Sequence, residues 1–237
     1  MGQPKLKAIC VGTPTDYGQE GAADPFDRPW RTSFYKAPVD GPRWLGSTNI
    51  EGDAQADTRA HGGPDKAVLA YSADHYLVWR TEMPEVPLEH GGFAENLDIS
   101  GLSEMNVCLG DSFAIGDAIV QVSQARQPCW KISRRWRVQD FALRVQHTGR
   151  TGWYLRVLQE GEIEAGMDVR LTERPHPQWT IARCNEVMHV LKKDRGLAAD
   201  LAAIPQLAES WQKTLQKRAE TGQNPNPAAR LVGGNRP

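Results

Sequence analysis

The residues with the clearest potential for chemistry surround Cys129, within residues 124–131. Arg126 and Lys131 flank this cysteine within three positions. A cysteine acts as a nucleophile or a metal ligand only as the thiolate, which nearby cations favour. Cys129 could equally be a small buried side chain packed beside Trp130, because free cysteines are among the most buried residues. Taken alone, the segment does not distinguish a reactive cysteine from a structural one.

A second candidate lies in residues 59–68, where two glycines stand among charged residues. Gly62 and Gly63 allow positive φ and a close approach of the backbone to a ligand. Successive N–H groups in such a turn can form a nest for phosphate. Positive charge is supplied by Arg59, His61 and Lys66. The alternative is a hairpin turn whose charges face solvent.

A third segment, residues 91–97, gives a weaker signal. Two glycines are followed there by Glu95 and Asn96. Because such side chains can simply cap a turn through hydrogen bonds, the composition of this segment does not by itself indicate a function.

Short strands are expected to position these segments in the first two-thirds of the chain. Apolar runs and alternating patterns predict strands at residues 6–11, 68–71, 118–123, 153–157 and 168–172. Helices are predicted at residues 75–80 and at 138–145, where apolar residues recur at helical spacing before Gly149. Short strands with glycine-rich joints are typical of a barrel or a sandwich.

The last third of the chain changes to a helical period. One helix is predicted after Thr180 as N-cap, a second at residues 197–203, and a third that begins at Pro205 and presents Trp211 on its apolar face. Three such short helices bury too little surface to be stable alone, so we expect them to pack on the barrel or on another subunit.

Three regions are therefore predicted: a barrel at residues 1–175, a three-helix domain at 176–220, and a tail at 221–237. The tail is rich in Gly, Asn and Pro and is expected to be disordered.

Bulk composition excludes several classes of protein. The formal net charge of −1 gives no basic footprint for nucleic acid. The four cysteines are far apart, which argues against a zinc knuckle or a disulfide scaffold. No apolar run reaches the roughly 18 residues of a membrane helix, and the first residues do not resemble a signal peptide. We expect a cytoplasmic protein without a membrane partner.

Four motifs, in this order, resemble the MOSC family, named after the C-terminal domain of molybdenum-cofactor sulfurase. They are HGGPDKAV at 61–68, GGFAENL at 91–97, CLGD at 108–111 and RQPCWK at 126–131. The run GRTGWYLRVLQEG at 149–161 and the helical segment that follows resemble the YiiM-like subgroup. The resemblance covers about residues 5–220. It implies a mainly β fold, with a MOSC-type β-barrel followed by a small three-helix C-terminal domain.

The resemblance also implies a cofactor and residues that hold it. The cysteine of the PCWK position, here Cys129, would be catalytic and would bind molybdenum or carry sulfur. Basic and glycine-rich loops would hold the phosphate-bearing pterin of the molybdenum cofactor (molybdopterin). The residues so assigned are Lys36, Arg59, His61, Gly62, Gly63, Asp65, Lys66, Asn96, Arg126, Lys131 and Arg150.

Two acidic residues and one departure from the family pattern complete the expected pocket. Asp53 and Asp57 fall in stretches similar to the family's pocket. Ala94 stands where many relatives have glycine, which leaves the shape of its loop open.

Three functions are compatible with this resemblance. The first is molybdenum-cofactor-dependent reduction of small N-hydroxylated compounds, such as N-hydroxylated purine base analogues, as a detoxification. A separate electron-donor reductase would then be a partner, because the chain has no cysteine cluster and no G-x-G-x-x-G motif. The second is a carrier of cofactor or persulfide sulfur without turnover, and the third is an interaction domain with an unused site. A homodimer is possible in each case.

Overall fold

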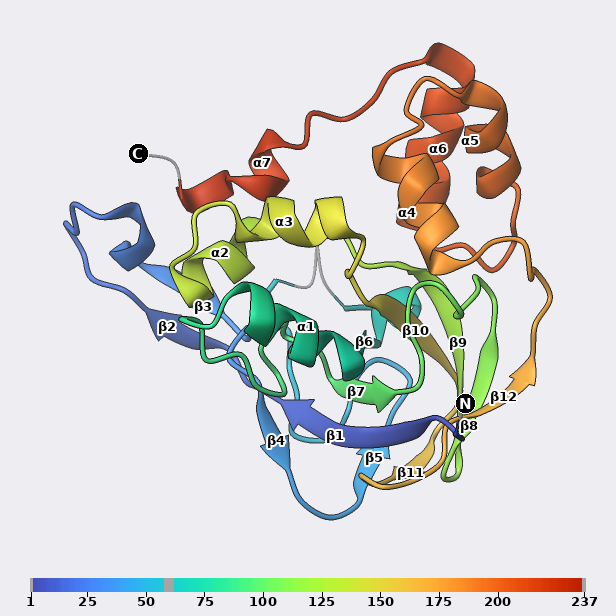
Figure 1. Ribbon diagram of the computed structural model, residues 1–237, viewed down its shortest axis with the longest axis horizontal. Coiled ribbons are helices and arrows are strands. Elements are labelled where there is room, and N and C mark those ends of the chain that lie inside the picture. The colour runs from blue at the N-terminus through green and yellow to red at the C-terminus, as the bar shows by residue number, and fades with distance from the viewer. Residues whose placement is uncertain (1, 58–61, 236–237) are drawn as a thin grey trace.

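A computed structural model describes residues 2–57 and 62–235. Its central feature is a curved sheet (Figure 1), which has eight strands. The strand order is β12-β8-β9-β10-β6-β7-β1-β4, antiparallel except for the parallel pair β6–β7. The strands are β1 (Lys5–Val11), β4 (Ala37–Val39), β6 (Val68–Ser72), β7 (Leu97–Ser100), β8 (Ser112–Ile115), β9 (Ala118–Ala125), β10 (Trp153–Gln159) and β12 (Arg170–Glu173). Two short pairs join β2 (Thr15–Tyr17) to β3 (Trp30–Thr32) and β5 (Arg43–Leu45) to β11 (Gly161–Ile163).

The sheet curls into an incomplete barrel around an apolar core. β6, in its middle, is buried along its whole length, in keeping with its largely apolar sequence. The two edge strands of the sheet, β12 and β4, are not neighbours in the strand order. Backbone hydrogen bonds from Leu6 N–H to the Met167 carbonyl (2.9 Å) and from Val169 N–H to the Pro4 carbonyl (2.8 Å) bring the start of β1 beside the segment before β12. The predicted fold class, a mainly β barrel-type domain followed by helices, is confirmed.

Three helices cover one side of this sheet and build a second core. They are α1 (Asp74–Glu82), α2 (Trp130–Trp136) and α3 (Phe141–Thr148), and their buried side chains pack with Tyr71 and Phe93. α1 and α3 confirm the helices predicted at 75–80 and 138–145, and α3 ends at Gly149 in the left-handed region, with φ +73°. α2 was not predicted from the sequence. Its residue Arg134 is buried, and the groups that accept its hydrogen bonds lie about 100 positions away, so no local pattern indicated a buried helix face here.

The three predicted C-terminal helices are present as α4 (Ile181–His189), α5 (Arg195–Ala202) and α6 (Glu209–Thr221). The Thr180 hydroxyl caps α4 by accepting from Arg183 N–H at 3.1 Å, as predicted. The third helix does not begin at the predicted Pro205 but at Glu209. The N–H of the preceding residue, Ala208, donates to the Ser123 carbonyl of β9 (2.9 Å) and so belongs to a contact with the sheet. Trp211 and neighbouring apolar residues join the same core as the barrel strands, so these helices pack on the barrel.

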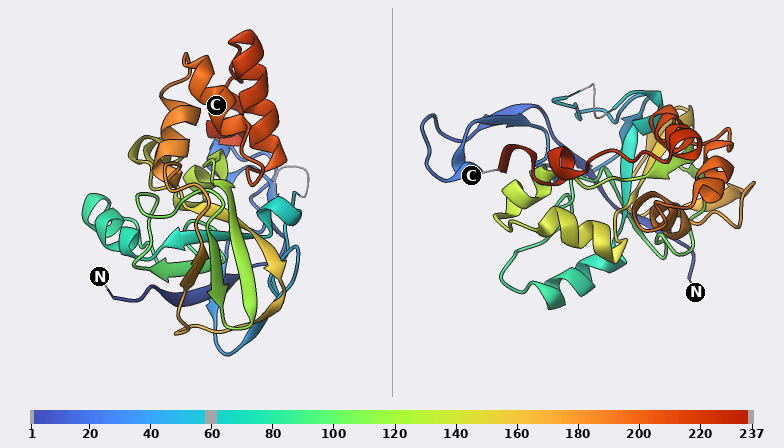
Figure 2. Two further views of the ribbon diagram at one scale, coloured as in Figure 1. Left: turned by 90° about the vertical axis from the view of Figure 1, so that its right-hand side faces the viewer. Right: turned by 90° about the horizontal axis from the view of Figure 1, so that it is seen from above.

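The predicted disorder of residues 221–237 is not what the structure shows for residues 222–235. This tail returns across the molecule and forms α7 (Ala228–Leu231) and the 3-10 turn η3 (Gly233–Asn235) over α2 and α3 (Figures 1 and 2). The Arg230 guanidinium donates to the Pro128 carbonyl, and Asn235 Nδ2 donates to the Trp130 carbonyl at 3.0 Å. Composition missed this order because side-chain contacts to distant segments provide it.

Among the described residues, no helix combines the length and the apolar character needed to cross a bilayer.

Candidate functional site

A pocket of about 660 Å³, its solvent-open mouth included, gathers most of the residues that the sequence singles out. Its walls come from loops beside β1 and β3, from the turn before β6, and from the segment between β9 and α2. The predicted residues that line it are Lys36, Gly62, Lys66, Asn96, Arg126, Cys129 and Lys131, together with Asp53 and Asp57. Segments up to 95 residues apart in sequence thus form one cationic pocket that contains a thiol.

Cys129 stands directly before α2, with extended backbone (φ −125°, ψ 166°), and is half-buried at the pocket wall. All four cysteines lie in the described part of the chain and are free thiols, and the other three are buried. Burial raises the pKa values of Cys10 and Cys184 far above the ordinary range. Cys129 is therefore the cysteine of this chain that a ligand in the pocket can reach.

Arg126 follows β9 directly and is only 3% exposed, although it lines the pocket. Its backbone N–H is held by the Gly152 carbonyl at 3.0 Å. Its Nη1 has no hydrogen-bond partner among the described residues. A buried guanidinium donor left unpaired is costly, and an anionic ligand in the pocket would satisfy it.

A buried network of Lys36, Asp53 and Asn96 forms the floor of the pocket. The Lys36 ammonium pairs with Asp53 Oδ1, and Asp53 Oδ2 accepts from Asn96 Nδ2 at 2.9 Å. Burial lowers the pKa of Lys36, and the Asp53 carboxylate opposes that shift. Asn96 also accepts from Leu69 N–H (3.1 Å), which fixes the network to β6. Because Asp53 balances Lys36, this network positions the pocket walls more than it adds net charge.

The glycine turn before β6 has the conformation that its sequence predicts. Gly62 and Gly63 have φ of +84° and +81°, and Gly62 lines the pocket whereas Gly63 does not. Lys66 ends the 3-10 turn η2 (Pro64–Lys66) and lines the pocket. Burial lowers its pKa, and the carboxylates of Asp65 and Asp57 oppose this. The expectations for Arg59 and His61 lie outside the described residues.

Besides Gly63, two predicted residues are not brought to the pocket, Asp65 and Arg150. Asp65 pairs with Arg156 (2.8 Å) and accepts from Glu209 N–H (3.1 Å), which ties α6 to the sheet. Arg150 makes two hydrogen bonds to the Glu82 carboxylate, at 2.9 and 2.7 Å, and lies over the Trp79 ring at 3.7 Å. Their positions in the motifs predicted a ligand-binding role for both residues. In the structure, Asp65 is instead paired with a basic residue, and Arg150 with an acidic and an aromatic one.

Sequence reasoning missed five polar residues of the pocket: Thr32, Ser33, Gln55, Gln127 and Tyr154. Burial raises the pKa of Tyr154 to about 12, although Arg126 lowers it. The alternation of β10 contained the signal for Tyr154, because the buried Trp153 and Leu155 on either side point to the opposite face of the strand. Gln127 could have been found only from its position between Arg126 and Pro128.

The donor set limits what this pocket can bind. Among residues 2–57 and 62–235, no group of three His, Cys, Asp or Glu side chains is arranged to hold a metal ion. One accessible thiol beside Arg126 and Lys131 instead suits an anionic ligand that brings the remaining metal ligands with it.

Comparisons with known proteins agree with this architecture. The MOSC domain model matches residues 57–170, and the model of the YiiM-like, 3-alpha helix domain matches residues 179–222. Protein YiiM of Escherichia coli (strain K12) is 36% identical over 204 residues, which are 85% of this chain and 91% of that protein. A protein named Reductase from Gibberella moniliformis is 36% identical over 177 residues, 73% of this chain and 31% of that protein. The crystal structure of YiiM from Geobacillus stearothermophilus superposes with a TM-score of 0.76 at 35% identity, covering 91% of this chain and 99% of that one.

Proposed function

This chain belongs to the MOSC family and carries the YiiM-like three-helix domain, and from this we propose that it is a molybdenum-cofactor-dependent oxidoreductase that reduces N-hydroxylated compounds. The observation that carries the proposal is the half-buried Cys129 in one pocket with the unpaired, buried Nη1 of Arg126. Similarity to a protein named Reductase supports the class of reaction.

The residues of the pocket fit a phosphate-bearing, metal-carrying ligand. Arg126 offers a buried donor that lacks a partner among the described residues, and Lys131 adds a second cation from the same segment. Cys129 offers one soft thiolate, the donor type that a soft, redox-active metal prefers. When bound, the molybdenum cofactor would supply the two-electron redox chemistry that this chain's own side chains cannot supply.

In this proposal the protein binds, orients and shields the reactants. Cys129 would be the protein's ligand to molybdenum, while Arg126, Lys66 and Lys131 would hold the phosphate end of the pterin. The Lys36–Asp53–Asn96 network would keep the floor of the pocket rigid, because each of its polar groups is already paired.

The overall reaction needs an external electron source. Conversion of an N–OH group to N–H consumes two electrons and two protons and releases one water. The four thiols of this chain are dispersed, so a separate reductase would deliver the electrons. N-hydroxylated purine base analogues are the proposed substrates, and their reduction would detoxify them.

A matched set of cysteine variants tests this function. The protein would be expressed in a host that makes the cofactor, and molybdenum content and released-pterin fluorescence would be measured. Reduction of an N-hydroxylated purine base by a reduced viologen dye would then be followed per bound molybdenum. We expect Cys129→Ser to abolish turnover with the fold intact. Cys184→Ser should keep turnover and lose about 1–3 kcal/mol of stability, because it buries a hydroxyl.

Two outcomes would contradict the proposal. Equal turnover in Cys129→Ser and the wild type would remove the role assigned to this thiol. Wild-type protein that binds the cofactor but reduces no N-hydroxylated compound would instead indicate a carrier of cofactor or sulfur.

A further inference from the structure

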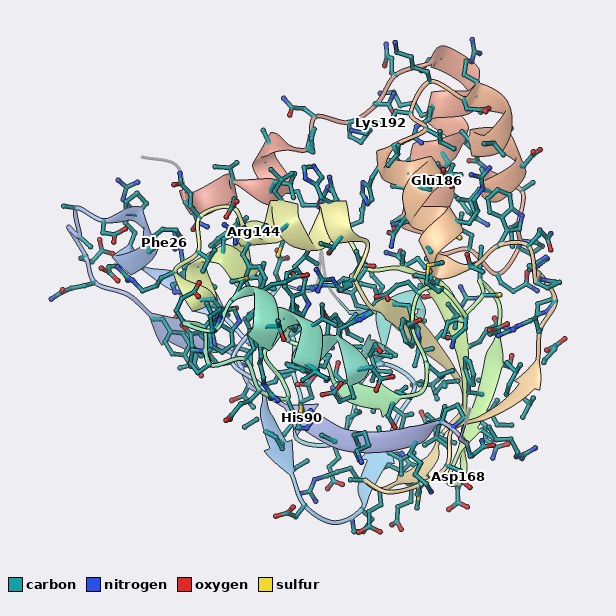
Figure 3. All side chains as sticks on the ribbon, in the orientation of Figure 1. Phe26, His90, Arg144, Asp168, Glu186 and Lys192 are labelled. Carbon is teal, nitrogen blue, oxygen red and sulfur yellow. The ribbon has the colours of Figure 1, made fainter. Side chains whose placement is uncertain are left out.

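A second cavity, of about 700 Å³ when its solvent-open mouth is included, lies between the C-terminal helices and the returning tail. The ends of α4 and α6 form one side of it, and residues 224–227 and Arg230 of the tail form the other. Asn224 Nδ2 donates to the Lys192 carbonyl at 3.2 Å and holds the tail against the loop after α4. The cavity is therefore built by segments that contact one another, and Figure 3 shows Lys192 beside the end of α4, near the tail.

The charge in this cavity is of one sign. Lys192, Arg218 and Arg230 line it together with His189, and none of its described lining residues is an aspartate or a glutamate. Burial, followed by the charges of the three cations, lowers the pKa of His189 to about 3. Like charges that line one cavity repel one another, so an anion between them would be stabilised.

Two buried nitrogen atoms at this cavity have no partner among the described residues. Arg218 is 1% exposed, and its two terminal nitrogens cap α4 by donating to the carbonyls of Val187 (2.7 Å) and Met188 (2.9 Å), but its Nε is unpaired. Nε2 of His189 is also buried and unpaired. Capping explains only part of the Arg218 side chain, and both the unpaired Nε–H of Arg218 and the ring nitrogen of His189 require another partner.

We propose that this cavity is a binding site for a phosphate group, separate from the Cys129 pocket, in which Lys192, Arg218, Arg230 and His189 surround the ligand. A tetrahedral phosphate offers acceptor oxygens in several directions. The donors of this cavity come from several directions as well, since they lie on α4, on the loop after it, on α6 and on the tail. A carboxylate, with two oxygens in one plane, would meet fewer of them.

The phosphate could be free or could be part of a larger ligand. Gln127 lines both this cavity and the Cys129 pocket. A ligand that extends from one pocket toward the other would pass this residue. Both sources share the same phosphate chemistry, and the experiment below distinguishes them.

Binding of inorganic pyrophosphate to the purified full-length protein tests the site. Isothermal titration would compare the wild type with Lys192→Gln, which removes one lining charge, and with Lys193→Gln, a control on the exposed neighbouring residue. Loss of one charge-assisted hydrogen bond, worth about 1.5–3 kcal/mol, predicts an affinity at least about tenfold weaker for Lys192→Gln. Lys193→Gln should bind as the wild type does.

A second measurement separates this site from the Cys129 pocket. NMR signals of the His189 ring should shift when pyrophosphate is added, and Lys66→Gln should leave that shift in place. Unchanged affinity in Lys192→Gln together with unmoved His189 signals would overturn the proposal and would assign any anion binding to the Cys129 pocket.

A nucleoside diphosphate identifies the source of the phosphate. If one ligand spans both pockets, Lys66→Gln and Lys192→Gln should each weaken its binding. If the site takes free phosphate, only Lys192→Gln should weaken binding, and the nucleoside should add no affinity over pyrophosphate. The site is independent of the proposed reaction, so pyrophosphate should still bind to Cys129→Ser, even if that variant keeps its turnover.

Discussion

The Arg230 guanidinium, in the C-terminal tail, donates to the carbonyl oxygen of Pro128, the residue directly before Cys129. The same side chain donates to Gln146 Oε1 in α3 at 2.6 Å. One arginine thus holds the segment with the pocket's thiol against the helix that covers the sheet.

We expect Arg230→Met to loosen this segment. The substitution leaves the Pro128 carbonyl and the Gln146 amide without their charged donor, which should lower the free energy of unfolding by about 1–3 kcal/mol. Alkylation of Cys129 by iodoacetamide under native conditions should become faster. Arg144→Met, which removes an exposed pair with Asp140, is the matched control and should change neither quantity appreciably. Identical alkylation rates in Arg230→Met and the wild type would show that the tail does not restrain the segment.

Asp53→Asn should be among the most destabilising single substitutions at the pocket. It leaves the buried Lys36 ammonium without its carboxylate, and breaking a buried pair in this way costs about 3–5 kcal/mol. The double variant Lys36→Met/Asp53→Asn removes both charges and should recover part of that loss. Urea unfolding of Asp53→Asn, Lys36→Met and the double variant measures the coupling energy between the two side chains. Losses of stability that simply add would argue against a coupled pair.

The pH dependence of stability should carry a contribution from Glu95. This carboxyl group is fully buried, and burial followed by the nearby Asp98 raises its pKa from 4.5 to about 7. Because the folded pKa lies above the unfolded one, the folded state binds the proton more tightly. The stabilisation is complete below pH 4.5 and is lost as pH rises to about 7, at most about 1.4 kcal/mol per pH unit.

Urea unfolding between pH 4.5 and 7.5 measures this dependence. Glu95→Gln keeps the size of the side chain and removes the titrating proton, so its stability should vary less over this range. The same slope in both proteins would rule out Glu95 as its source.

Ala94→Gly should raise stability. Ala94 lines the Cys129 pocket with φ of +60°, in the left-handed region, where a side chain costs about 1–2 kcal/mol and glycine costs almost nothing. Part of this gain is offset by the greater freedom of glycine in the unfolded chain. Ala114→Gly, in strand β8, should instead lower stability by roughly 0.5–1 kcal/mol. Thermal unfolding of both variants tests whether the backbone at Ala94 is strained. A lower melting temperature for Ala94→Gly than for the wild type would contradict this strain.

The sequence predicted those features that local pattern determines. Periodicity located β1, β6, β9, β10 and β12, together with α1, α3 and the three C-terminal helices, but not β4, β7 and β8. Thr180 was identified as a cap because capping is a contact between near neighbours. The motifs predicted a shared pocket, and Cys129 and Arg126 do share one.

Features that depend on distant contacts could not be predicted in this way. Arg150 looks like a ligand residue in its motif, yet its charge is taken by Glu82, 68 positions away. The tail looks disordered in composition, yet Arg230 and Asn235 fix it to residues about 100 positions earlier. Such pairs become visible only when the chain is folded.

The course of the tail has a practical consequence for recombinant work. The described chain ends at Asn235, whose side chain bonds to the Trp130 carbonyl one residue from Cys129 and to Arg134 in α2. An affinity tag at this end of the chain would follow a segment that contacts the neighbour of Cys129. The first described residues lie on the other side of the molecule, where Gln3 and Pro4 bond to Val169 just before β12 (Figure 1). Purification handles, fluorophores and immobilisation linkers are therefore better attached at the N-terminal end.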